Sequence, residues 1–251
     1  MNRFYLDKSK LTKDFAIIEG SEARHIISVL RLNKGDKVTV FDGNSVEYEA
    51  IIDNVSLNRV ELLLISKKIS SKESFIKITV AQALLKDKKM DTLIRQLTEL
   101  GITEWLPFVA KRSVPKPTCS SSKNRLERWQ KITIEALKQC DRNNLPTVSD
   151  IISFDNVLEH SLEYDLKIIF WEQEIQSLYS MISDIKKVDK IIIIMGPEGG
   201  FSIEEIELAK EHGFIVGSLG PRILRAETAT IAACSIIQYL FGDMGNKHKT
   251  E

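Results

Sequence analysis

Two glycine-rich stretches with charged neighbours are the parts of this sequence best suited to chemistry. The first, GPEGG at residues 196–200, follows the apolar run IIIIM at 191–195. Its glycines do not have the spacing of either common phosphate-binding loop, and the carboxylate of Glu198 would repel a bare phosphate. A neutral or partly cationic ligand therefore suits this turn better.

The second stretch, LGPRILRAETA at residues 219–229, also follows a short apolar segment and leads into an expected helix. Glu227 and Thr228 occupy the helix start, where a carboxylate and a hydroxyl can meet free backbone amides. If the two stretches lie side by side, they form one pocket. With Glu198 and Glu227 as acids and Arg225 as a cation, that pocket can bind a zwitterion and move a proton.

The elements around these stretches predict an α/β domain from residue 75 onward. A strand that is apolar at every position, such as 191–195, suits the middle of a sheet, and ligands bind at the carboxyl ends of such strands. Strands and helices alternate, which favours a mostly parallel sheet. The expected strands are IKITVAQAL, EWLPFV, LKIIFWE, IIIIMG and FIVGSLG. The expected helices are one over Met90–Leu100 that ends at Gly101, one from about Arg125 to Arg142 after a polar loop, one opened by a Ser202/Glu205 capping box, and one from near Glu227.

The first seventy residues instead predict a small, mostly β barrel. Five short strand-like segments occur there, and the dipeptide Asp42-Gly43 is a strong hairpin signal. One helix interrupts the strands, with Ser21 as its expected N-cap. The polar segment KKISSKES at 67–74 is the best linker. We therefore expect one domain at 1–72 and a second at 73–246.

Charge and composition limit which classes of function and ligand are possible. The chain of 251 residues has no net charge, but residues 75–150 carry 14 Lys or Arg against 8 Asp or Glu. Such a basic region suits nucleic acid, although a solvated helix face gives the same pattern. The three cysteines and four histidines lack metal-ligand spacing, so we expect no metal. With no membrane-length apolar run and no signal peptide, a cytoplasmic protein without membrane contact is expected.

The paired stretches resemble the C-terminal motifs of the SPOUT class of S-adenosylmethionine-dependent RNA methyltransferases. HIISVLRLNKGDKVTVFDG, LLKDKKMDTLIRQLTELGI and RWQKITIEALKQCDRNNLP narrow the resemblance to the RsmE family, which methylates N3 of a uridine in 16S ribosomal RNA. The resemblance covers almost the whole chain. It implies a trefoil-knotted α/β methyltransferase domain, an N-terminal PUA-like β-barrel that binds RNA, and a homodimer with catalytic sites at the interface. The implied cofactor is S-adenosylmethionine. The implied partner is 16S ribosomal RNA, either naked or, as we expect, within the assembled small subunit.

The resemblance also implies roles for individual residues. The implied cofactor residues are Gly196, Pro197, Glu198, Gly199, Leu219, Gly220, Leu224, Thr228 and Ala229. Glu198 or Glu227 would accept the N3 proton while Arg225 stabilises the uracil oxygen. The alternative is that each glutamate only caps a helix or fixes a loop. The implied RNA contacts are Arg31, Lys86, Arg112, Arg128 and Arg142, each of which can instead be a solvated surface charge.

The sequence leaves the roles of several residues and two alternative functions open. Gln96 stands where the family commonly has lysine, and Glu99, Gln139 and Arg142 fit a structural hydrogen-bond network as well as they fit substrate contact. A SPOUT methyltransferase acting on transfer RNA or another ribosomal site is one alternative function. A non-catalytic RNA-binding protein that retains the knot is another, although the intact loops argue against it.

Overall fold

The computed structural model describes residues 2–69, 72–176, 178–185 and 187–245. The chain forms two compact units. Met1–Glu73 and Leu137–Leu145 make up the first, and Ser74–Ala136 and Pro146–Glu251 the second. The chain therefore leaves the first unit, returns to it for nine residues, and then completes the second.

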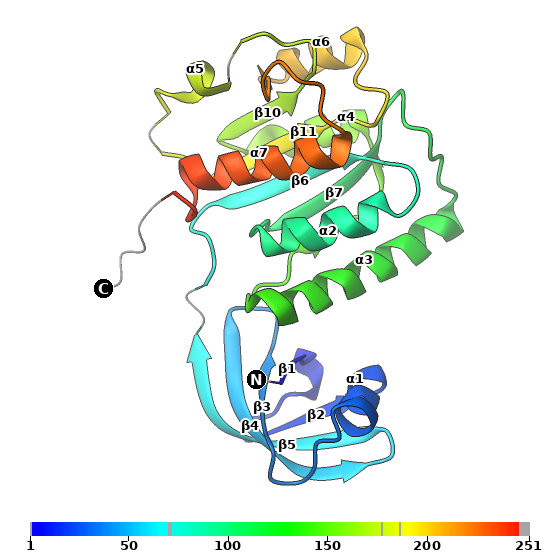
Figure 1. Cartoon of the computed structure of the whole chain (residues 1–251), viewed down its shortest axis with the longest axis vertical. Helices are drawn as coiled ribbons and strands as arrows, with labels where there is room; N and C mark the ends of the chain where they lie inside the picture. Colours follow the sequence, from blue (N-terminus) through cyan, green and yellow to red (C-terminus); the bar gives the residue numbers. More distant parts are fainter. Residues whose placement is uncertain (1, 70–71, 177, 186, 246–251) are drawn as a thin grey trace. The chain divides into compact units, whose positions relative to one another are not determined.

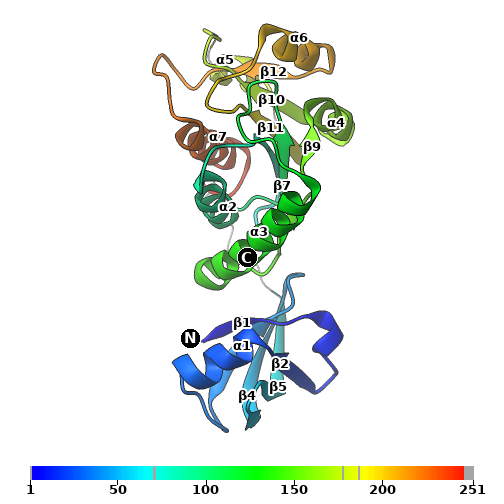
Figure 2. The same ribbon diagram turned by 90° about the vertical axis from the view of Figure 1, so that its right-hand side faces the viewer.

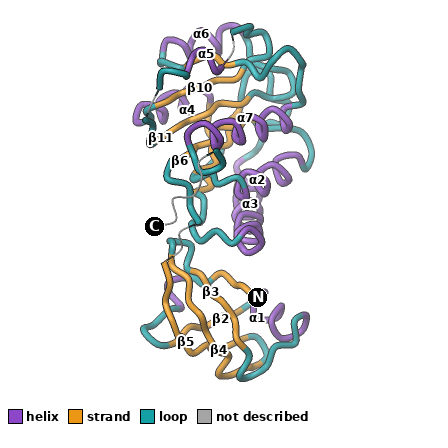
Figure 3. The backbone as a smooth tube through the Cα atoms, turned by 60° about the vertical axis from the view of Figure 1, so that its left-hand side comes forward, coloured by secondary structure: helices purple, strands orange, loops and turns teal. Residues whose placement is uncertain are grey.

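The first unit is built on a curled five-stranded sheet (Figure 3). Its strand order is β1-β3-β4-β5-β2, with β1 parallel to β3 and the other neighbours antiparallel. The strands are β1 (Arg3–Tyr5), β2 (Phe15–Glu19), β3 (Lys37–Phe41), β4 (Val46–Ser56) and β5 (Arg59–Ile69). The expected hairpin joins β3 to β4. Asp42 Oδ1 accepts a hydrogen bond from the Asn44 amide at 2.8 Å, and Gly43 adopts a positive φ of 75°.

The helical segment of this unit begins differently from expectation. Gly20, not Ser21, is the N-cap of α1 (Ser21–Arg24), and it has φ 71° and ψ −134°, a conformation that favours glycine. Ser21 is therefore the first helical residue and makes no cap. A π-helical turn, His25–Val29, continues α1 and buries Ile26 against the sheet.

The segment expected to be a linker, 67–74, is only partly one. Residues 67–69 continue β5, and residues 70–71 lie outside the described part. Glu73 is held tightly. Its carboxylate accepts hydrogen bonds from Arg142 Nη2 at 2.8 Å and from the amides of Asn143 and Asn144 at 3.0 and 2.9 Å. This network attaches the returning segment Leu137–Leu145 within the first unit.

The second unit contains a parallel seven-stranded sheet, as its alternating pattern predicts. The order is β12-β10-β11-β6-β7-β8, and β9 also pairs with β7. The strands are β6 (Lys77–Ala83), β7 (Glu104–Val109), β8 (Thr147–Val148), β9 (Ile152–Ser153), β10 (Leu166–Phe170), β11 (Lys190–Met195) and β12 (Ile215–Gly217). The apolar strand β11 lies between β10 and β6, away from both edges.

Helices cover both faces of this sheet (Figures 1 and 2). They are α2 (Lys89–Glu99), α3 (Cys119–Cys140), α4 (Phe154–His160), α5 (Leu178–Ile182), α6 (Ile203–Glu211) and α7 (Ala226–Phe241). Ile191 and Ile193 pack in one core with side chains of α2, α5 and α7, whereas Ile192 and Ile194 pack in another with α4 and α6. Four successive isoleucines are therefore explained by burial on both faces.

Helix α3 begins at Cys119, about six residues before its expected start. The polar residues read as a loop instead form its first turn. Ser121 Oγ and Ser122 Oγ each donate to the Thr118 carbonyl at 3.0 Å, and the Thr118 amide donates to Ser121 Oγ at 2.9 Å. Serine hydroxyls here satisfy backbone groups at the helix start, a use that competes with their role in loops. Within the described residues, every helix is too short or too polar to cross a bilayer.

Candidate active site

A cavity of about 500 Å³ opens where three parallel strands end. The chain leaves β10 at Phe170, β11 at Met195 and β12 at Gly217, and the residues that follow each strand line the cavity. Parallel strands bring their carboxyl ends to one edge, so both glycine-rich loops reach the same place. Of the nine expected cofactor residues, eight line it: Gly196, Pro197, Glu198, Gly199, Leu219, Gly220, Leu224 and Ala229.

The first loop is a tight turn. The Gly200 amide donates to the Pro197 carbonyl at 3.0 Å, and Gly200 has a φ of 67° that favours glycine. Gly199 packs against Arg112: a Cβ at Gly199 would lie 3.2 Å from Arg112 Cβ. Arg112 Nη1 also donates to the Gly199 carbonyl at 3.1 Å. Little room is left at this turn for any residue but glycine.

A buried glutamine that the sequence analysis did not single out joins the two loops. Gln82, at the end of β6, is fully buried. Its Nε2 donates to the Gly196 carbonyl at 3.2 Å, and its Oε1 accepts a hydrogen bond from Thr230 Oγ1 at 2.7 Å. Because Thr230 lies in the first turns of α7, this one amide group connects the first loop to the helix that follows the second.

The capping box expected after the first loop is present. The Ser202 amide donates to Glu205 Oε2 at 2.8 Å, and the Glu205 amide donates to Ser202 Oγ at 3.3 Å. Glu205 Oε1 additionally accepts from the Lys111 amide at 2.8 Å. The nearly buried carboxylate of Glu205 therefore fixes the start of α6 and the loop that follows β7 together.

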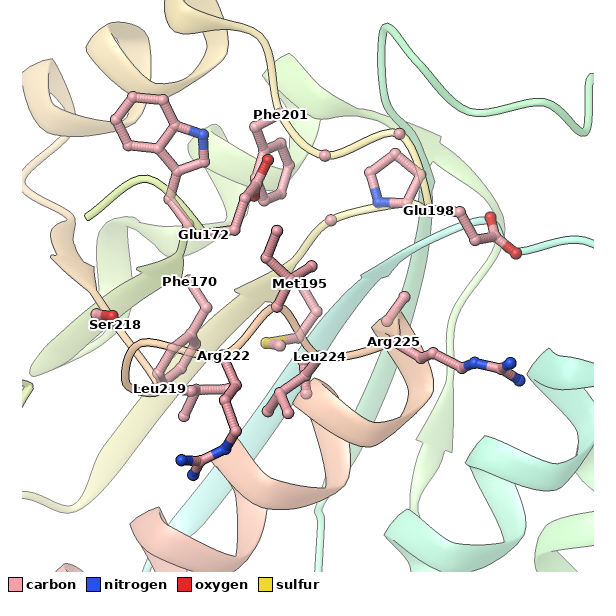
Figure 4. A pocket seen from close by; sticks show the side chains of 18 of the residues that line it. Phe170, Glu172, Met195, Glu198, Phe201, Ser218, Leu219, Arg222, Leu224 and Arg225 are labelled. Atoms are coloured by element: carbon pink, nitrogen blue, oxygen red, sulfur yellow. The ribbon is translucent and has the colours of Figure 1, made fainter. Parts of the chain in front are cut away.

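Apolar side chains from two strand ends and from the second loop line the cavity. Figure 4 shows the side chains of Phe170, Met195, Leu219 and Leu224 gathered between the loops, whereas Arg222 and Arg225 extend away from them. Arg225 is the N-cap of α7 through its backbone, with no side-chain cap. The cavity thus has an apolar floor and charged groups at its rim.

The two candidate carboxylates meet one lysine. Glu198 Oε1 lies 3.0 Å from Lys89 Nζ and accepts a second hydrogen bond from the Lys86 amide at 3.1 Å. Burial raises the pKa of Glu198, but these hydrogen bonds outweigh burial and hold that pKa below its ordinary value. Glu227 Oε2 is buried and forms an ion pair with the same Nζ at 3.5 Å, too long for a hydrogen bond, and no other polar group of the described residues bonds to it. Among the described residues neither glutamate makes a helix-cap hydrogen bond, but Glu198 does fix a loop through the Lys86 amide, as its alternative role requires.

Glu227 and Thr228 are not among the residues that line this first cavity. They line a second cavity of about 730 Å³ with residues of α2, among them Thr92 and Gln96. Thr228 was expected to contact cofactor, yet its place on the α2-facing side of α7 puts it on this neighbouring cavity. Gln96, which stands at the usual lysine position, faces the same space.

The five expected RNA contacts have different surroundings. Arg31 is exposed in the first unit, and Lys86 and Arg112 are exposed in the second. Arg128 forms an ion pair with Asp91 at the start of α2. Arg142 is 5% exposed and paired with Glu73, so its side chain takes part in a structural hydrogen-bond network, the alternative role considered for it above.

Several wall residues were not foreseen, chiefly Phe170, Trp171, Glu172, Phe201 and Ser218. Phe170 ends the strand LKIIF, and Trp171 and Glu172 follow it directly. Because β10 is a neighbour of β11 in the same parallel sheet, the residues after it must share the ligand edge. Applying this rule, that residues after each parallel strand lie at the ligand edge, to the strand predicted at LKIIFWE would have pointed to this part of the wall.

Comparisons with known proteins agree with this architecture. Residues 72–238 match the RNA methyltransferase domain, and residues 18–65 match the RNA methyltransferase PUA domain. Ribosomal RNA small subunit methyltransferase E of Bacillus subtilis (strain 168) is 34% identical over 247 residues, which is 95% of this chain and 96% of that protein. The chain belongs to the ribosomal RNA small subunit methyltransferase E family. A Rickettsia conorii member is 32% identical, over 95% of this chain and 96% of its own.

A solved member of the family supports the same fold. The Neisseria gonorrhoeae enzyme, crystallised bound to S-adenosyl methionine, superposes with a TM-score of 0.87 at 32% identity, covering 97% of this chain and 99% of its own. The methyltransferase E family fold therefore accounts for both units, the curled PUA-like sheet and the α/β domain. Among the described residues, no group of three or more His, Cys, Asp or Glu side chains is placed to hold a metal ion.

Proposed function

We propose that this chain transfers a methyl group from S-adenosylmethionine to N3 of a uridine in 16S ribosomal RNA. The observation that carries the proposal is the cavity between the two loops, found in a chain whose family relatives are named for small-subunit ribosomal RNA methylation. The ribosomal substrate is proposed from the names of those relatives, and the N3 position is what the resemblance to the RsmE family implies.

The cavity fits such a cofactor. Its volume lies in the range of small-molecule sites. Glycine backbone at 196 and 199 lets amides and carbonyls approach an adenine edge, and Met195, Leu219 and Leu224 can cover its faces. The carboxylates of Glu172 and Glu198 suit a ligand that carries a sulfonium and an amino group.

The reaction requires N3 of the uracil to lose its proton, because the neutral imide is a poor nucleophile. The bound cofactor supplies the electrophilic methyl group. Glu227 is the better candidate for proton acceptor, because it lies on the second cavity and contacts Lys89 at 3.5 Å, whereas Glu198 is fixed at 3.0 Å by Lys89 and at 3.1 Å by the Lys86 amide. Arg225, exposed at the rim, can stabilise the negative charge that develops on a uracil oxygen.

RNA would be held by exposed cations. Lys86 and Arg112 flank the first loop, because the Lys86 amide binds Glu198 and the Arg112 guanidinium binds the Gly199 carbonyl. Arg31 offers a contact on the PUA-like unit. Arg128 can join them by giving up its exposed ion pair, while Arg142 supports the fold.

The remaining features of the proposal concern assembly. We infer a homodimer whose catalytic sites lie at the interface, a trefoil knot formed by the chain around the second loop, and a cytoplasmic location with the small ribosomal subunit as substrate. The exposed Tyr239 and the half-exposed Ile236 on α7 support a further contact for this helix. Light scattering of the purified protein measures the dimer directly.

The test is transfer of labelled methyl from S-adenosylmethionine to purified small subunits, naked 16S RNA, large subunits and transfer RNA. Label is expected in small-subunit RNA alone. Label confined to transfer RNA would favour the alternative function, a SPOUT methyltransferase that acts on transfer RNA. A non-catalytic protein would give no label anywhere. A thermal-shift measurement with saturating S-adenosylmethionine shows whether the protein binds the cofactor at all. A ligand at about 100 times its Kd stabilises the folded protein by about 2.7 kcal/mol, so binding raises Tm measurably.

Two variants separate the roles of the glutamates. Glu227→Gln is expected to lower kcat by about 10²-fold or more while cofactor affinity changes little, as for loss of a general base. Glu198→Gln is expected to weaken cofactor binding, because it loosens the first loop. Glu211→Gln, at an exposed site on α6, is the control. Wild-type turnover in both test variants would remove the carboxylate-base mechanism.

A further inference from the structure

Lys89 joins three separate elements at the active site. It is the first residue of α2, and its ammonium lies within 3.5 Å of Glu198 on the first loop and of Glu227 on α7. All three side chains are about a quarter to a third exposed. They therefore form one partly buried group of two carboxylates and one cation.

Lys89 also has a special position relative to the two cavities. Among the described residues that line them, it is the one that lines both. Glu198 lies on the cofactor cavity, and Glu227 lies on the second cavity. The ion-paired group therefore lies between the two cavities; under the proposed function the first would hold the methyl donor and the second the substrate base.

The physical role of the ammonium follows from the charges around it. Two carboxylates in one site without a cation repel each other, and one of them takes up a proton or moves away. The other charged groups near Lys89 are Asp87 and Lys88, which precede it and line the second cavity, and Arg225 at the rim of the first. Within the described part of the chain, Lys89 is the cation that forms ion pairs with both Glu198 and Glu227, so it neutralises the pair.

We propose that Lys89 is a positioning residue for methyl transfer, which holds Glu227 toward the second cavity by pairing it with the anchored carboxylate of Glu198. Glu198 is fixed twice, by Lys89 and by the Lys86 amide, so it serves as the fixed end of this arrangement. Glu227 forms the longer contact, 3.5 Å from Lys89 Nζ through its buried Oε2. The inference rests on the proposed function and adds a residue to it.

A double-mutant cycle tests this role, with kcat, the KM for S-adenosylmethionine and Tm measured for each variant. Lys89→Met is expected to lower kcat at least tenfold with a smaller change in KM, because a displaced catalytic group slows the chemical step. In a Glu227→Gln background the same substitution is expected to change kcat less than threefold, since the group it positions is already absent. Lys89→Arg keeps the charge and is expected to recover most of the lost kcat.

The control is Arg95→Met, which removes an exposed cation from the same helix. It is expected to keep the wild-type kcat. Equal losses from Lys89→Met in both backgrounds, or an arginine variant no better than methionine, would overturn the proposal. Should Lys89→Met fail to fold, Lys89→Gln and Lys89→Arg complete the same cycle. An inactive wild-type protein would instead overturn the proposed function, so the two failures are distinguishable.

Discussion

The carboxylate of Glu205 gives a quantitative test of how the first loop is held. It accepts two backbone hydrogen bonds, from Ser202 and Lys111, each at 2.8 Å, while the side chain is almost fully buried. A hydrogen bond to a charged group contributes about 1.5–3 kcal/mol, and an unpaired buried amide costs about as much. At about 1.5 kcal/mol for each bond, Glu205→Ala is expected to destabilise the second unit by about 3 kcal/mol.

For a domain of this size, each kcal/mol lowers Tm by about 2–4 °C, so Glu205→Ala is expected to lower Tm by about 6–12 °C. Glu205→Gln keeps one acceptor oxygen and is expected to lose about half as much. Calorimetry of the full chain measures both. Weaker S-adenosylmethionine binding is also expected, because the first loop ends two residues before Ser202.

Glu204→Ala is the matched control. Glu204 lies beside Glu205 in the first turn of α6 and pairs with Lys111 Nζ at 3.3 Å, but both side chains are largely exposed. Exposed ion pairs contribute little, so Tm is expected to stay within about 2 °C of the wild type. If Glu205→Ala lowered Tm no more than Glu204→Ala, the reasoning from burial would be refuted.

Three further variants probe the network around the site and the first unit. Gln82→Leu leaves the Gly196 carbonyl without its partner; we expect a loss of about 1–3 kcal/mol and weaker cofactor binding by calorimetry, and unchanged affinity would contradict the link between the loops. Arg142→Ala leaves the buried negative charge of Glu73 without its ion-pair partner, so denaturant unfolding is expected to show about 3 kcal/mol of destabilisation. Wild-type stability combined with weaker RNA binding would instead support Arg142 as an RNA contact. Burial raises the pKa of Glu104, but its hydrogen bonds outweigh burial and hold that pKa below its ordinary value. The ionised carboxylate therefore stabilises the fold at neutral pH, and this stabilisation is lost as the pH falls and the carboxylate takes up a proton. Glu104→Gln is expected to lower Tm more at pH 7 than at pH 4, and an equal shift at both pH values would contradict this.

Local patterns in the sequence predicted the positions of the elements well. Strand β7 and the helix that ends before Gly101 follow from apolar periodicity and a glycine terminator, both readable within a dozen residues. The capping box of Ser202 and Glu205 also depends only on residues three apart. Two local predictions were wrong. Gly20 replaced Ser21 as a cap, and α3 began early because serine hydroxyls satisfied its first turn.

What the sequence could not predict depends on partners far apart in the chain. The sequence left Arg142 open between RNA contact and a structural network, and its partner Glu73 lies 69 residues away. Lys89 had no signal of its own, because its role arises only when a loop and a helix more than a hundred residues later converge on it. The place of Thr228 on the second cavity also depends on α2, far away in the sequence, and its contact with cofactor stays a prediction.

The most direct test of the central claim is mass-spectrometric mapping of small-subunit RNA from cells lacking the enzyme, before and after treatment with purified protein and S-adenosylmethionine. A single new N3-methyluridine in 16S RNA is expected, absent when Glu227→Gln protein is used for the same time. A methyl group on another atom or another RNA, or no methylation by protein that binds the cofactor, would contradict it.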